Sequence, residues 1–123
     1  MRRDLAYLED IVEASDAIAE FIRDLDMESF LSNPMLKSAL AYQFTVIGEA
    51  AARVTGDLRE RHPLVPWAKA KGMRNVVVHH YFGVAWDEVW RTATLDIPAL
   101  RGQIAELLRA EFPDSGLLPR GGS

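Results

Sequence analysis

Apolar residues recur every three or four positions along most of this 123-residue chain, which is the spacing of one face of an α-helix. In the first segment, residues 4–25, charged residues separate the apolar ones. The apolar positions there are Leu5, Leu8, Ile11, Val12, Ile18, Phe21, Ile22 and Leu25. The spacing predicts an amphipathic helix with these residues on its inner face, followed by a polar break at residues 26–29.

A second helix is predicted from Asn33, because asparagine is a preferred N-cap residue and Pro34 follows in the first turn. Its apolar stripe runs through Leu36, Leu40, Phe44, Ile47, Ala51 and Val54. Gly56 is expected to end this helix, since glycine is common just beyond a helix C-terminus. Residues 56–66 are expected to be a loop, with a short helix at residues 67–70.

The segment at residues 73–81 contains three consecutive valines and would suit a strand on propensity alone. No partner strand is evident in the sequence, and a single strand leaves its backbone groups unpaired, so a helix is predicted. Gly83 should end it, and Asp87 should cap the next helix. Pro98 should begin a new helix or kink the existing one, with Asp96 as the cap. The inner face of this region should comprise Val89, Trp90, Ala93, Leu95, Leu100, Ile104, Leu107 and Leu108.

Together these segments predict an all-α protein, an antiparallel bundle of four to five helices. Residues 1–112 are expected to form one such domain. Residues 113–123 are rich in turn formers and end near glycines, so a disordered tail is expected there. Part of it, LLPRGGS, resembles a protease site or linker added for expression.

The chain is mildly acidic, with a formal charge of −4 at pH 7. Affinity for nucleic acid of any sequence comes from concentrated basic residues, so a generic nucleic-acid binder is disfavoured. Six basic residues within a short span could form a local basic site, or could simply belong to an ordinary solvated face. They are Arg53, Arg59, Arg61, Lys69, Lys71 and Arg74.

The chain has no cysteine and no apolar run near the ~20 residues of a membrane span. Disulfides and thiol chemistry are excluded. The start of the sequence also lacks the apolar core of a secretory signal. A cytoplasmic protein with no membrane partner is expected.

Residues able to do chemistry concentrate in GMRNVVVHHYFGVAWDEVW, residues 72–90. On a helix, Arg74 and Tyr81 are seven residues apart and share nearly one face, while Asn75 and His79 are four apart and adjacent. The other half of the helix carries Val76, Val77 and His80. One helix can therefore pack valines inside and present polar groups to a groove.

Arg74 and His79 are sufficient parts for cleaving RNA without a metal. Arginine offers a planar fork of donors to a phosphate, and histidine takes and gives a proton near neutral pH. The neighbouring 2′-hydroxyl of the RNA is the nucleophile, so the protein needs to supply only proton transfer and charge stabilisation. The alternative is a surface arginine and a satisfied interior histidine, a pairing that many helices contain by chance.

The spacing R-x4-H-x-Y at Arg74, His79 and Tyr81 resembles the signature of HEPN domains, and in particular of HepT-like toxins from two-gene toxin–antitoxin modules. Three further stretches resemble that family in the same order. They are YLEDIVEA near the start, VIGEAAARV at residues 46–54 and RHPLVPW at residues 61–67. The resemblance covers about residues 7–108.

The resemblance implies a HEPN-like homodimer in which Arg74 and His79 of both chains line a shared cleft. It implies a metal-independent endoribonuclease without a cofactor that acts on tRNA or mRNA. It also implies a partner, an MntA-like minimal nucleotidyltransferase antitoxin, which neutralises the toxin by AMPylation of the motif tyrosine, here Tyr81. The alternative, favoured by the acidic balance, is a catalytically inactive HEPN module that binds a nucleotidyltransferase or a nucleotide.

Supporting roles are expected for Asn75 and Tyr81. Glu49, in IGEA, either orients Arg74 or His79 or belongs to an internal network. His80 stands where the family pattern has a small residue such as glycine. It is either a second proton carrier or a bulkier residue at a tolerant position.

The remaining aromatic and histidine residues have simpler expectations. His62 precedes Pro63 and is expected to be a turn residue. With three histidines and no H-x3-H spacing, no metal site is expected. Three tryptophans are expected to pack in the core or a dimer contact, with base stacking as the alternative. They are Trp67, Trp86 and Trp90.

Overall fold

The computed structural model describes residues 2–80 and 85–114, except for the side chains of residue 2 and residues 76–80. Every regular element in these ranges is helical, which confirms the predicted all-α class. The elements are α1 (Arg2–Phe21), α2 (Met27–Leu31), α3 (Pro34–Arg53), α4 (Gly56–Arg61), α5 (Trp67–His80), α6 (Trp86–Arg91), the π-helical segment η1 (Thr92–Asp96) and α7 (Ile97–Glu111). No helix among the described residues is long and apolar enough to cross a membrane.

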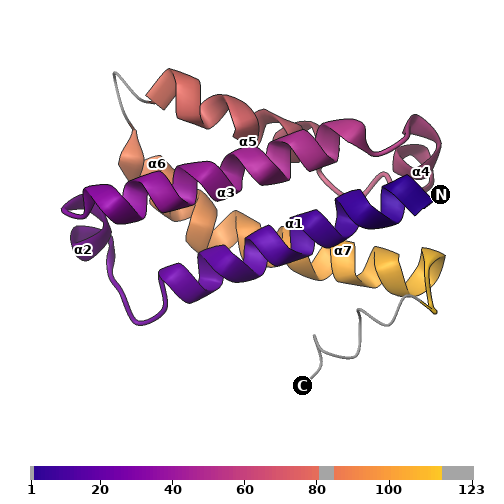
Figure 1. The fold of residues 1–123 in the computed structure, drawn as a ribbon, viewed down its shortest axis with the longest axis horizontal. Helices are drawn as coiled ribbons and strands as arrows, with labels where there is room; N and C mark the ends of the chain where they lie inside the picture. The colour runs from indigo at the N-terminus through magenta and orange to yellow at the C-terminus, as the bar shows by residue number, and fades with distance from the viewer. Residues whose placement is uncertain (1, 81–84, 115–123) are drawn as a thin grey trace.

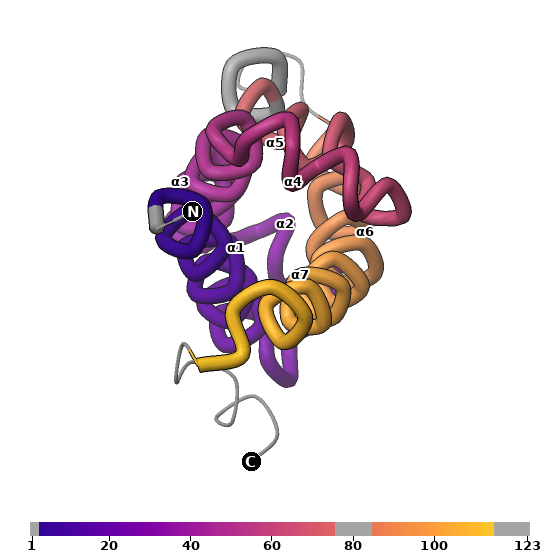
Figure 2. The backbone as a smooth tube through the Cα atoms, turned by 90° about the vertical axis from the view of Figure 1, so that its right-hand side faces the viewer, coloured from indigo at the N-terminus to yellow at the C-terminus, as the bar shows by residue number. Residues whose placement is uncertain are grey.

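Four long helical runs form the bundle, because α6, η1 and α7 follow one another without a break. Figure 1 shows α1 and α3 running antiparallel, with α5 along the other side of α3 and α7 alongside α1. Seen end on in Figure 2, the order around the bundle is α7, α1, α3, α5 and α6. Side chains from these helices fill the centre. The largest fully buried ones include Leu8, Ile11, Phe44, Ile47, Ile104 and Leu108.

The predicted apolar faces are largely correct, with three exceptions. Phe21 and Leu25 are exposed because α1 ends at Phe21 and the helical register stops there. A positive φ of 62° at Asp24 accompanies the turn that follows. Leu95 is 65% exposed, since it lies two residues from buried Ala93 and so on roughly the opposite side of the helical turn, and Ile97 takes the inward place instead.

Two short helices occupy segments predicted to be a break and a loop. Asp26 caps α2, its Oδ1 accepting a hydrogen bond of 2.8 Å from the Ser29 backbone nitrogen. Thr55 caps α4 in the same way, through the backbone nitrogen of Leu58 at 3.4 Å. Gly56 therefore begins α4 rather than ending α3, which stops at Arg53. In each case a polar N-cap residue, Asp26 or Thr55, favours the start of a helix in a segment whose composition alone predicted a break or a loop.

Helix α5 confirms the helical prediction for the valine-rich segment and joins it to the predicted helix at residues 67–70. Asn33 caps α3 as predicted, accepting a 3.0 Å bond from the backbone nitrogen of Leu36. Tyr81 and Gly83 lie outside the described residues, as does the tail from residue 115 onward.

The predicted caps at Asp87 and Asp96 are wrong. Ala85 holds the N-cap position of α6, and Asp87 lies in its first turn. Asp96 already has helical dihedrals at the end of η1, so no free helix end remains there for it to cap. The π-helical turn, in which the Ile97 nitrogen donates to the Thr92 carbonyl, leads directly into α7 with Pro98 in its first turn.

Candidate active site

Helices α3 and α5 come into close backbone contact where Gly48 meets Arg74. A Cβ atom at position 48 would lie 2.4 Å from the backbone nitrogen of Arg74 and 2.6 Å from its Cβ. Contacts this short do not occur, so glycine is the residue that this crossing accommodates. This contact fixes the position of Arg74 along the axis of α3.

The side chain of Arg74 reaches a carboxylate on the neighbouring helix. Its Nη1 lies 3.4 Å from Oε2 of Glu49, whose other oxygen, Oε1, is 3.7 Å from Nη2 of Arg53. The Arg74 side chain is 34% exposed and that of Glu49 46%. Half-exposed pairs of this kind contribute little to stability, about 0–1 kcal/mol. Arg74 can therefore exchange its carboxylate partner for a phosphate at small cost.

Other predicted site residues follow Arg74 on α5. Asn75 is exposed, next to Arg74. The backbone places His79 on the same helix, about 7.5 Å further along its axis, followed by His80. The side chains of His79 and His80, like those of Val76 and Val77, lie outside the description, and so does the whole of Tyr81. The structure thus brings Glu49 and Arg74 together and sets His79 on the same helix.

A pocket of about 230 Å³ adjoins this pair between α1 and α3. We call it the α1–α3 pocket. Tyr7 and Asp10 line it from α1, and Thr45, Val46, Glu49 and Arg53 line it from α3. Glu49 is therefore shared between the pocket and the contact with Arg74.

The predicted basic cluster does not form one continuous positive surface. Arg61 pairs with Asp57 at 2.5 Å and with Glu111 at 3.0 Å, and Lys69 pairs with Asp96 at 3.1 Å. The alternative of a solvated, largely neutralised face fits these contacts better. Arg74 and its neighbour Arg53 remain as the basic groups around Glu49.

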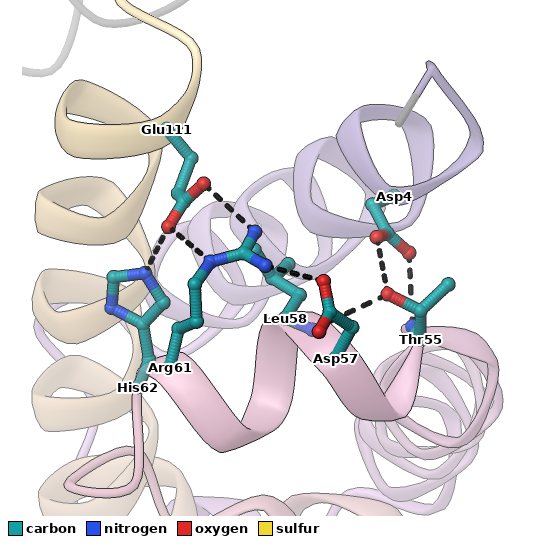
Figure 3. Close-up of polar contacts among 7 residues, drawn as sticks. All are labelled: Asp4, Thr55, Asp57, Leu58, Arg61, His62 and Glu111. Carbon is teal, nitrogen blue, oxygen red and sulfur yellow. Dashed lines mark hydrogen bonds and ion pairs between the residues drawn. The ribbon is translucent and has the colours of Figure 1, made fainter.

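His62 lies in the turn predicted for it, and its ring contacts the end of α7. Its Nε2 is 2.6 Å from Oε2 of Glu111, which also accepts from Arg61, as Figure 3 shows. Hydrogen bonds from Arg61 and His62 lower the pKa of Glu111 to about 2. These residues are some fifty positions apart in the chain, so no spacing in the sequence signals the contact.

At its other end, α4 is attached to the start of α1. The carboxylate of buried Asp4 accepts from the Thr55 backbone nitrogen at 3.0 Å and from its hydroxyl at 2.7 Å (Figure 3). Burial raises the pKa of Asp4, but the hydrogen bonds from Thr55 outweigh it, so the pKa lies below its usual value. No spacing in the sequence signals this contact either, because Asp4 and Thr55 are 51 positions apart.

All three tryptophans pack against the core, which confirms the simpler of the two expectations for them. Phe30 lies between two of these rings, with centroids 6.1 Å from Trp86 and 5.4 Å from Trp90. Trp67 donates from Nε1 to the carbonyl of His62 at 2.9 Å. No group of three or more His, Asp or Glu side chains suited to a metal occurs in the part of the chain that the structure describes.

Comparison with known proteins decides the family. The family model described as "Ribonuclease HepT-like" matches residues 11–107, a span that includes Glu49, Arg74, His79 and Tyr81. The chain belongs to the HepT-like ribonuclease family. This confirms the resemblance stated from the sequence.

Several curated proteins are similar to the chain over most of their length. The chain is 39% identical over 101 residues to "Probable ribonuclease HepT" of Thermococcus cleftensis, covering 82% of this chain and 92% of that protein. It is 37% identical over 109 residues to "Putative RNase MJ0125" of Methanocaldococcus jannaschii, covering 88% and 94%. It is 35% identical over 104 residues to "Putative RNase MJ1380" of the same organism, covering 84% and 95%. No solved structure matches the chain.

Proposed function

We propose that this HepT-like chain is a metal-independent endoribonuclease in which Arg74 binds the scissile phosphate and His79 transfers protons. The observation that carries the proposal is the position of Arg74. Its backbone is fixed against Gly48, while its guanidinium is part-exposed and, among the described residues, is paired with the surface carboxylate of Glu49. A preorganised, exchangeable cation is what phosphate binding requires.

The reaction follows from these groups. The 2′-oxygen of one nucleotide attacks the adjacent phosphorus and loses its proton to a base, and the P–O5′ bond breaks as that oxygen takes a proton from an acid. The products are a 2′,3′-cyclic phosphate and a free 5′-hydroxyl. Arg74 stabilises the charge that builds up on the phosphorane oxygens. His79 serves as base or acid, and Asn75 and Tyr81 position the RNA.

One reaction needs both a base and an acid, so we propose a homodimer in which His79 of each chain contributes to a shared cleft. In the described residues α5 packs chiefly against α3, which leaves part of its surface for a second copy. His80 is then either a second proton carrier or a bulkier neighbour. If the protein is a monomer by light scattering at micromolar concentration, the shared cleft does not exist.

The regulation proposed for this site is AMPylation of Tyr81 by an MntA-like minimal nucleotidyltransferase. In this proposal the chain is the toxin, which cleaves tRNA or mRNA, and the nucleotidyltransferase is its antitoxin. The added phosphate and adenosine would occupy the space that RNA needs and repel its charge. Co-expression with that enzyme and mass spectrometry test this. AMP on Tyr81 is the expected result, and AMP only on another residue contradicts it.

A second candidate is an inactive HEPN module that binds a nucleotidyltransferase or a nucleotide. The formal charge of −4 favours it, since a chain with net negative charge has little general affinity for RNA phosphates. The Arg74 and His79 pair favours the first candidate.

Cleavage of RNA in the presence of a chelator separates the two candidates. The wild type should cut total tRNA or mRNA, and Arg74→Ala and His79→Ala should each lose at least about a hundredfold in rate. Lys71→Ala is the matched control, because it removes an exposed cation from the same helix and should cut normally. If the wild type leaves both RNAs intact, the inactive module is the better description.

A further inference from the structure

The α1–α3 pocket touches the proposed active site through a shared side chain. Glu49 is one of the residues that line the pocket, and its Oε2 lies 3.4 Å from Nη1 of Arg74. A group bound in the pocket is therefore a neighbour of whatever Arg74 holds, because both would adjoin the Glu49 side chain. If Arg74 holds a phosphate of an RNA strand, that neighbour is another part of the same strand.

The pocket has the size of a base rather than of a whole nucleotide. Its volume is about 230 Å³, below the ~300 Å³ at which pockets that enclose drug-sized ligands begin. Val46 and buried Ala50 provide apolar lining, and the partly buried ring of Tyr7 provides an aromatic one. Single-stranded bases bind to proteins by stacking on such rings.

The polar groups of the pocket differ in how far they are already engaged. Glu49 contacts Arg53 and Arg74, and the Thr45 hydroxyl donates to the Ala41 carbonyl at 3.0 Å. Asp10 is exposed and pairs with no cation in the described residues, and it lies one turn from Tyr7 on α1. The pocket therefore offers a free carboxylate beside an aromatic ring.

From this combination we infer that the α1–α3 pocket is a nucleobase subsite for a guanine of the substrate RNA next to the phosphate on Arg74. A carboxylate accepts hydrogen bonds only, and guanine presents two donors side by side on its Watson–Crick edge, N1–H and N2–H. Asp10 can accept both while Tyr7 stacks on the ring. Arg53, 63% exposed at the rim, can contact a flanking phosphate. The inference rests on the proposed ribonuclease function and specifies its substrate.

Binding of an uncleavable RNA tests the subsite apart from catalysis. The probes are labelled 2′-O-methyl oligouridylates that carry a single guanine or a single inosine, and inosine lacks only the N2 amino group. By fluorescence anisotropy the wild type should bind the guanine probe about tenfold more tightly. Asp10→Asn should abolish that preference. Tyr7→Leu should lower the affinity for both probes, whereas Tyr7→Phe should leave both affinities unchanged.

Glu13→Gln is the matched control, since Glu13 is an exposed acid on the same helix outside the pocket, and it should retain the preference. Equal binding of the two probes by the wild type, or an unchanged preference in Asp10→Asn, overturns the inference even if RNA is cut. A preference for guanine without any cleavage of RNA supports the guanine subsite and contradicts the proposed ribonuclease activity. Loss of the dimer in Asp10→Asn or Tyr7→Leu shows that a second copy covers the pocket, which also overturns it.

Discussion

The backbone nitrogen of Arg74 lies so close to the α-carbon of Gly48 that a methyl group on Gly48 would come within 2.4 Å of it. The cation of the proposed active site is therefore placed by contact between two backbones. The Glu49 carboxylate adds only a surface ion pair of 3.4 Å to this arrangement. Small changes on α3 should thus alter the site more than changes of charge around it.

Gly48→Ala should both destabilise the protein and reduce activity. The added methyl group forces α5 away from α3, and overpacking of this kind costs about 1–3 kcal/mol. Thermal unfolding and RNA cleavage measure the two effects. Gly72→Ala and Gly102→Ala are the controls, because nothing lies within 4 Å of a Cβ at either position. Each should be neutral or stabilising by up to about 1 kcal/mol. Equal stability of the three variants contradicts the close crossing.

Glu111→Gln should destabilise the protein at neutral pH by about 1–2 kcal/mol, because Arg61 and His62 lose a charged acceptor. The pKa of Glu111 falls from 4.5 to about 2 in the folded chain. Its contribution is therefore complete above about pH 4.5 and is lost as the pH falls toward 2. Urea unfolding from pH 7 to 3 should show the difference between wild type and Glu111→Gln shrinking. A difference that stays constant with pH contradicts the pairing.

Thr55→Val should cost about 1–3 kcal/mol, since it removes both the cap of α4 and the 2.7 Å bond to Asp4. Valine keeps the shape of the side chain, so the loss reports the hydroxyl. Thr45→Val is the comparison, because the Thr45 hydroxyl bonds only to a carbonyl of its own helix. Its effect on the free energy of unfolding in urea should be well below 1 kcal/mol. Similar losses in both variants would show that Thr55 has no special role.

Phe30→Ala should cost about 3–5 kcal/mol, because it opens a cavity between Trp86 and Trp90 under the short helix α2. The near-ultraviolet circular dichroism of the two tryptophans should change as well. Met35→Ala, at a residue that is 77% exposed, should change neither quantity measurably. An unaltered tryptophan signal in Phe30→Ala contradicts the packing.

The sequence predicted the long helices well and the short ones poorly. Helical periodicity over twenty residues, as in α1 and α3, leaves little choice of structure. Helices α2 and α4 have five and six residues, too few for a pattern, and only their caps announce them. The π-helical turn before Pro98 has no signature in composition.

For the site, the pattern of α5 predicted which residues share a helix. It did not predict that Gly48 sets the position of Arg74, because that contact joins residues on different helices. The same holds for the α1–α3 pocket, whose members come from two segments far apart in the chain. Both features depend on packing between helices, which the periodicity of one segment does not encode.

Helix α4 has only six residues, yet it is bonded to the first turn of α1 through Asp4 and to the last turn of α7 through Glu111. A helix this short has almost no stability of its own. Its amides should therefore exchange with solvent together with those of both terminal turns, as one locally unfolding unit. Fraying of the first turn of α1 would then promote local unfolding of the last turn of α7, and the reverse. Because the carbonyl of His62 also holds Trp67, the same event would release the beginning of the helix that carries Arg74.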